Sequence, residues 1–80
     1  MQYDVEMRAA KPPFTGGLIC EASFPDGTSI RIEEAKRGAR AVLLSERREP
    51  LATSVESSCA VGWWTMYHDG NIYAAHVSGT

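Results

Sequence analysis

Apolar and polar residues alternate along the first part of the chain. Apolar side chains stand at every second position, as Tyr3, Val5, Met7 and Ala9, with Gln2, Asp4, Glu6 and Arg8 between them. A period of two is typical of a strand with one buried face. Lys11-Pro12-Pro13 then ends the pattern, because proline donates no backbone hydrogen bond. We therefore predict a strand over residues 2–9.

Two turn motifs predict two hairpins. Pro25-Asp26-Gly27 separates an alternating run at 18–24 from another at 28–33, and Asp69-Gly70 separates the aromatic segment 60–67 from 72–77. Asp-Gly pairs favour tight hairpin turns, because aspartate bonds to nearby backbone and glycine accepts a positive φ. The four flanking segments are predicted to be strands.

The middle of the chain, residues 34–58, is open to two interpretations. We predict a strand over 39–45. The alternative is a helix across 34–49, although Gly38 at its centre costs about 1 kcal/mol relative to alanine. Residues 51–58 fit a strand, and they fit equally well a short helix that has Pro50 at its first position.

These elements predict one domain, residues 1–80, that is mainly β: a single small antiparallel sheet or barrel of five to seven strands built from hairpins. The alternative is an α+β domain with one helix within 34–58 packed on the sheet. The expected core consists of the larger apolar side chains of the strands, namely Val5, Met7, Leu18, Cys20, Phe24, Ile30, Ile32, Val42, Leu44, Leu51, Val55, Val61, Trp63 and Ile72.

Charge and hydropathy narrow the classes of function. Eight Lys and Arg against ten Asp and Glu give a net charge of −2, whereas a phosphate-contacting nucleic-acid binder normally has a basic excess. No apolar run approaches the ~20 residues that cross a bilayer. The N-terminus shows no basic segment followed by an apolar one, so no signal peptide is expected. We expect a cytoplasmic protein with no membrane contact.

Candidate catalytic and metal-binding residues are few. Cys20 and Cys59 lack the spacing of a zinc site, and we expect two reduced, buried thiols, with a disulfide as the alternative. His68 and His76 lie on opposite arms of the last hairpin without a third ligand. No nucleotide-binding or nucleophile motif is present. The sequence therefore predicts no enzyme, no cofactor and no metal.

The last hairpin carries the residues that we expect to bind a partner. Trp63 and Trp64 are adjacent, so in a strand they point to opposite faces, and one of them is expected to be exposed. Aromatic residues are enriched at binding hot spots. The predicted partner-binding set is Trp63, Trp64, Tyr67, His68 and Tyr73. The alternative is that both tryptophans are buried because the sheet is covered on both sides.

Most of the positive charge lies in one stretch, and its members form a candidate basic patch: Lys36, Arg37, Arg40, Arg47 and Arg48. Such a patch would contact phosphate or an acidic protein. The interleaved Glu33, Glu34, Glu46 and Glu49 favour ordinary solvated turns instead. Together with Arg31, this patch would serve the alternative function, a small nucleic-acid-binding β-barrel.

Size and the absence of catalytic motifs predict a small non-catalytic inhibitor that binds a protein or ribonucleoprotein complex, as a monomer or homodimer. In size and composition, over its whole length, the chain resembles phage-encoded inhibitors of bacterial defence, the anti-CRISPR proteins. The resemblance implies that the chain would block DNA binding by a CRISPR surveillance complex in the host cytoplasm. No motif carries it, so it identifies no binding residue.

Overall fold

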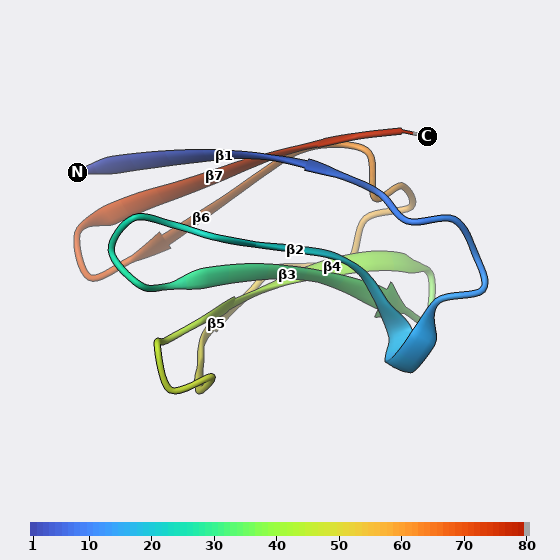
Figure 1. Ribbon diagram of the computed structural model, residues 1–80, viewed down its shortest axis with the longest axis horizontal. Coiled ribbons are helices and arrows are strands. Elements are labelled where there is room, and N and C mark those ends of the chain that lie inside the picture. The colour runs from blue at the N-terminus through green and yellow to red at the C-terminus, as the bar shows by residue number, and fades with distance from the viewer. Residues whose placement is uncertain (80) are drawn as a thin grey trace.

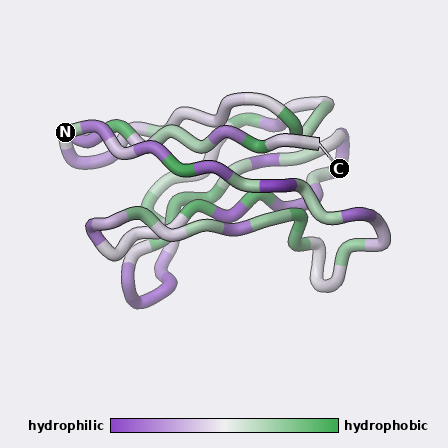
Figure 2. Tube along the Cα trace, turned by 45° about the horizontal axis from the view of Figure 1, so that its top comes forward, coloured by the Kyte–Doolittle hydropathy of each residue, from purple (hydrophilic) through white to green (hydrophobic). Residues whose placement is uncertain are grey.

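The computed structural model describes residues 1–79 and consists almost entirely of strands. The elements are β1 (Gln2–Arg8), a 3₁₀ turn η1 (Thr15–Gly17), β2 (Leu18–Ser23), β3 (Ser29–Ala35), β4 (Gly38–Leu44), β5 (Pro50–Thr53), β6 (Gly62–His68) and β7 (Asn71–Ser78). Figure 2 shows hydrophobic and hydrophilic residues alternating along these strands. Among residues 1–79, no helix has the length and apolar character needed to span a bilayer.

The strands form two sheets that lie in two layers (Figure 1). The three-stranded sheet has the order β1-β7-β6, and the four-stranded sheet has the order β2-β3-β4-β5. All neighbours are antiparallel except β1 and β7, which are parallel. The prediction of a mainly β domain built from hairpins is confirmed. The strands make two open sheets, neither one sheet nor a closed barrel, and the alternative of a helix within residues 34–58 is wrong.

Both predicted turns are present. In the β2–β3 turn, the Asp26 carboxylate accepts hydrogen bonds from the Thr28 backbone N–H at 3.0 Å and from its hydroxyl at 2.6 Å. In the β6–β7 turn, Asp69 and Gly70 have φ values of 50° and 77°. Positive φ at both central residues is the geometry of the tight turn that Asp-Gly favours. The two hairpins therefore follow from local turn chemistry.

The core lies between the sheets. The three-stranded sheet contributes Met7, Trp64, Met66, Tyr73, Ala75 and Val77, and the four-stranded sheet contributes Ile19, Ile30, Ile32, Ala39, Ala41 and Leu43, with Phe24 at the end of β2. Each large side chain that is fully buried contributes about 1.5–3 kcal/mol.

An aromatic cluster joins the two layers. Tyr73 stacks on Tyr3 with ring centroids 5.4 Å apart and meets Phe24 edge-on at 5.0 Å. The Tyr73 hydroxyl donates a 2.6 Å hydrogen bond to Asp26 in the opposite layer. Burial, and then this hydrogen bond, raise the pKa of Tyr73. The turn that connects β2 and β3 is thus fixed to the centre of the other sheet.

Several predicted core residues lie elsewhere. Trp63, Val55 and Val61 are exposed, so their assignment to the core is wrong. Val42 and Leu44 are buried, but the inward positions of β4 belong to Ala39, Ala41 and Leu43. The register explains this, because Ile30 and Ile32 of β3 pair with Leu43 and Ala41 and share their face.

Candidate functional site

The outer face of the three-stranded sheet carries exposed aromatic side chains, and we call it the aromatic face. Because side chains alternate along a strand, Trp64 and Met66 of β6 point inward while the residues between them point outward. Pairing with β7 and β1 arranges the face in three rows, Trp63–His76–Glu6, Thr65–Ala74–Asp4 and Tyr67–Ile72–Gln2.

Trp63 and Tyr67 are the most exposed aromatic residues within residues 1–79, with 63% and 69% of their surface accessible. They lie four residues apart on one strand, which at ~3.3 Å per residue separates their Cα atoms by about 13 Å. The row between them has short side chains, Thr65 and Ala74. Two large apolar surfaces therefore stand on either side of a low strip of sheet.

A row of side-chain contacts runs across the face from Trp63 to β1. The Trp63 and His76 rings lie 4.9 Å apart, tilted by 38°. The other side of His76 contacts β1, where its Nδ1 lies 3.1 Å from Glu6 Oε2. His76 thereby links the exposed tryptophan to a carboxylate two strands away.

The aromatic face is acidic. Strands β6 and β7 contain no Asp, Glu, Lys or Arg, so its charges come from β1 alone. Asp4 and Glu6 are exposed in the middle of β1, and Arg8 stands at its end. Within residues 1–79 neither carboxylate makes a salt bridge with Lys or Arg; Asp4 accepts a hydrogen bond from Gln2 at 3.2 Å.

The structure divides the predicted partner-binding set. Trp63 and Tyr67 lie on the aromatic face, whereas Trp64 and Tyr73 are buried, with exposures of 7% and 2%. The Trp64 indole N–H donates to the Ala60 carbonyl at 2.8 Å. His68 is partly buried at the end of β6, opposite Asn71. The opposite orientation of the two tryptophans is confirmed.

Sequence reasoning missed the polar members of this face. The sequence marks Asp4 and Glu6 only as polar positions of the first strand, and His76 only as a histidine without a third metal ligand. Their proximity to Trp63 depends on the parallel pairing of β1 with β7, in which Glu6 lies opposite His76. The polar positions of the first alternating run were the available signal, but nothing local indicated which strand they adjoin.

The outer face of the four-stranded sheet is different, and we call it the charged face. Glu33 accepts hydrogen bonds from Arg40 Nε at 2.8 Å and from Arg31 Nε at 3.1 Å. Arg48 makes two bonds to the carboxylate of Glu21, at 2.9 and 2.8 Å. These arginines line one shallow hollow together with Val42 and Leu44.

Ion pairing changes the pKa values on the charged face. The hydrogen bond from Arg40 holds the pKa of Glu33 below its ordinary value, and the bond from Arg48 does the same for Glu21. The pKa of Arg48 is raised in turn by Glu21. The arginines of this face are therefore engaged in intramolecular pairs.

The candidate basic patch is split between two ends of the four-stranded sheet. Lys36 and Arg37 lie in the β3–β4 turn, whereas Arg47 and Arg48 lie in the β4–β5 turn. Arg40 stands on β4 and is paired with Glu33. The five residues thus form no continuous cationic surface.

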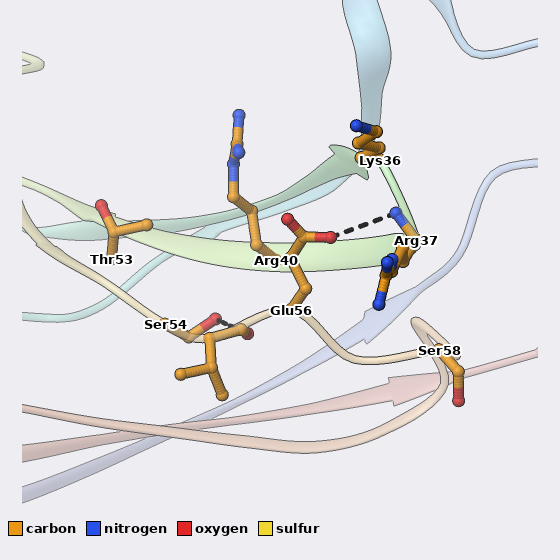
Figure 3. Close-up of a pocket in the computed structure, with 8 residues that line it drawn as sticks. Lys36, Arg37, Arg40, Thr53, Ser54, Glu56 and Ser58 are labelled. Carbon is orange, nitrogen blue, oxygen red and sulfur yellow. Dashed lines mark hydrogen bonds between the residues drawn. The ribbon is translucent and has the colours of Figure 1, made fainter.

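Lys36, Arg37 and Arg40 line an open pocket of about 740 Å³ (Figure 3). Its other walls come from the chain after β5, including Ser54 and Val55. A carboxylate also lies in this pocket, because Glu56 accepts a 3.1 Å hydrogen bond from the Arg37 backbone N–H. That negative charge opposes the binding of an anion at the same place.

The remaining reactive groups are separate. Cys20 and Cys59 are free; Cys20 is partly buried, which raises its pKa, while Cys59 is exposed. The expectation that both thiols are buried is therefore wrong for Cys59. Among residues 1–79, no group of three or more His, Cys, Asp or Glu side chains is placed to hold a metal ion.

Comparisons with protein-family models, with curated proteins and with solved structures found no match to this chain. The case for a function therefore depends on the geometry of the two outer faces.

Proposed function

We propose that this chain is a non-catalytic protein-binding module, and that the aromatic face contacts a basic surface of its partner. The proposal depends on the exposure of Trp63 and Tyr67 on the outer face of a sheet whose inner face packs against the core. Solvent exposure of two large aromatic side chains leaves apolar area to be buried on binding. Tryptophan and tyrosine are also the residues that contribute most at protein interfaces.

Charge supports a basic partner. Asp4 and Glu6 lie next to the aromatic rows without arginine or lysine partners. An arginine of the partner would meet an aromatic ring and a carboxylate within the same face. Stacking of a guanidinium group on an aromatic ring contributes about 0.5–2 kcal/mol to binding, and pairing with a carboxylate fixes the orientation of the guanidinium plane.

Alanine substitution of Trp63 tests the proposal. Proteins retained by the immobilised chain from its native host would be identified, purified and titrated against the wild type and Trp63→Ala by calorimetry. We expect Trp63→Ala to weaken binding at least about 30-fold, equivalent to about 2 kcal/mol, and to leave the circular dichroism spectrum unchanged.

Val55→Ala is the matched control, since Val55 is also an exposed apolar residue but lies in the segment after β5, where it lines the pocket at Lys36 and Arg37. Its affinity should equal that of the wild type. Equal affinity of Trp63→Ala and the wild type would contradict the proposal. Double substitution Asp4→Asn and Glu6→Gln should weaken binding and reduce its salt dependence.

A narrower form of the proposal names the partner as a CRISPR surveillance complex whose DNA binding is blocked. Its support is the resemblance in size and composition to anti-CRISPR proteins. The test is target-DNA binding by purified surveillance complexes, with and without the chain. Inhibition by the wild type and its loss in Trp63→Ala are expected; undiminished DNA binding would leave the general proposal in place and remove this one.

A further inference from the structure

We infer that β6 is a pairing edge, and that two copies of this chain associate through antiparallel β6 strands into one continuous six-stranded sheet. An edge strand leaves alternate backbone N–H and C=O groups free to pair with another strand. Apart from the β6–β7 ladder, no backbone–backbone hydrogen bond within residues 1–79 involves residues 62–68. The edge of β6 therefore has no backbone hydrogen-bond partner within residues 1–79, and β5 at the edge of the other sheet lies near it without pairing.

The other three sheet edges carry features that oppose pairing. β1 has alternating charges at Asp4, Glu6 and Arg8. β2 has a register shift between Leu18 and Cys20. β5 has only four residues, starts with a proline and pairs with β4 through a register shift. Short length, proline, charge and bulges are the usual protections of an edge.

β6 has none of these protections. Its seven residues, Gly62–His68, include no proline and no Asp, Glu, Lys or Arg, and it pairs with β7 without a register shift. A regular, uncharged, aromatic edge is the kind that recruits another strand. The contrast with the other three edges is what selects this one.

The sequence of β6 is self-complementary about Thr65. In an antiparallel pair with its twofold axis at Thr65, Trp63 of each copy lies opposite Tyr67 of the other, and Trp64 lies opposite Met66. Aromatic pairs and Thr–Thr pairs are favourable directly across two strands. No charged side chains are brought together.

This association closes on itself. A twofold interface uses the same edge of both copies, and no second unprotected edge remains for a third copy. The aromatic faces of both copies would then lie on the same side of one sheet. The inference does not depend on partner binding, since it concerns the purified chain alone.

Sedimentation equilibrium of wild type, Thr65→Lys and Thr53→Lys tests the inference. The wild type should show a concentration-dependent species of twice the 8.7 kDa monomer mass. Thr65→Lys places two ammonium groups opposite each other and should raise the dimer dissociation constant at least about tenfold. Thr53→Lys puts the same exposed substitution on the edge strand β5 and should dimerise like the wild type.

Cross-linking provides a second readout, which also decides the matter if Thr65→Lys fails to fold. In a Cys20→Ser, Cys59→Ser background, Thr65→Cys should form a disulfide-linked dimer on mild oxidation. Directly opposed residues have Cα atoms about 4.5–5.5 Å apart, which a disulfide can bridge. Thr53→Cys in the same background should remain monomeric on a non-reducing gel.

A wild type that sediments as a monomer up to about 1 mM would overturn the inference. So would a dimer that persists in Thr65→Lys and gives no Thr65→Cys cross-link, because association would then use another surface. Both results leave the partner-binding proposal untouched, since that proposal is tested by Trp63→Ala against a separate protein.

Discussion

The two sheets present different surfaces to solvent. On the charged face, the apolar side chains of Val42 and Leu44 lie among arginines that are paired with Glu21 and Glu33. These arginine side chains therefore cover the apolar residues of the outer face. On the aromatic face, Trp63 and Tyr67 stand exposed, and within residues 1–79 the carboxylates of Asp4 and Glu6 have no arginine or lysine partner, although Glu6 contacts His76. The arginines of the charged face are paired with glutamates of the same sheet, whereas the aromatic face leaves apolar area and carboxylates exposed. The two faces therefore differ mainly in whether their charged side chains are paired within the sheet, and the number of charges alone does not describe that difference.

The largest expected effect separates the two adjacent tryptophans. Trp64→Ala should lower the free energy of unfolding by about 3–5 kcal/mol, because it empties a core position and removes the indole bond to Ala60. Trp63→Ala should change the free energy of unfolding by less than about 1 kcal/mol. Urea denaturation followed by circular dichroism measures both. Similar losses for the two variants would mean that the aromatic face is structural.

The next effect tests whether the charged face covers its apolar residues. Leu44→Ala should lower the free energy of unfolding by about 2 kcal/mol, because Leu44 is 6% exposed even though it lies on an outer face. Ile72→Ala, at an outward position on the aromatic face, should cost less, because Ile72 is only partly buried. Urea denaturation of the two variants under identical conditions gives the comparison, and a larger loss for Ile72→Ala would reverse it.

A smaller effect should appear on acidification. The pKa values of Glu21 and Glu33 are lower in the folded chain than in the unfolded chain. Their contribution to stability is therefore present above the unfolded value of about 4.3 and is lost as the pH falls through the folded values. The free energy of unfolding should fall as the pH is lowered below about 5.

Urea denaturation across this pH range, repeated on charge-neutral variants, locates the source of that fall. Glu21→Gln with Glu33→Gln should be less stable at pH 7 and should lose less on acidification. The matched pair Asp4→Asn with Glu6→Gln removes two carboxylates that have no arginine partner, and should keep the wild-type pH dependence. An unchanged pH dependence in the Glu21→Gln, Glu33→Gln variant would show that the ion pairs of these two glutamates with arginine do not stabilise the fold.

The smallest effect concerns the arginine stems. Arg40→Met keeps most of the aliphatic stem and loses the ion pair to Glu33, whereas Arg40→Ala loses both. We expect Arg40→Met to be more stable than Arg40→Ala by about 0.5 kcal/mol, because the stem covers apolar surface. Urea denaturation of both variants shows which is more stable. Equal stabilities would mean that the whole effect of replacing Arg40 comes from the loss of its charge.

Local chemistry predicted much of this fold. The alternation of the first strand, the Asp26-Gly27 turn and the Asp69-Gly70 turn are features of a few neighbouring residues, and each gave the right element. The face of β4 could not be predicted in the same way, since Ala41 and Leu43 on one side are no more apolar than Val42 and Leu44 on the other. Pairing with Ile30 and Ile32 decides it.

The candidate site was predicted only in part, for the same reason. The strand period showed that one tryptophan of the pair is exposed, but not which one. That choice depends on Tyr73 and Ala75 of β7, which flank Trp64 on its inward side. The acidic border of the aromatic face depends on a contact between residues about seventy positions apart, and no local pattern encodes such a pairing.

The parallel pairing of β1 with β7 has a consequence for synthesis of the chain. Residues 18–53, which form the four-stranded sheet, are contiguous and can assemble as soon as they leave the ribosome. The first strand must wait, because its neighbour Asn71–Ser78 is synthesised about seventy residues later. The inward side of the four-stranded sheet therefore stays uncovered until Asn71–Ser78 has been synthesised, and the aromatic face is completed only then.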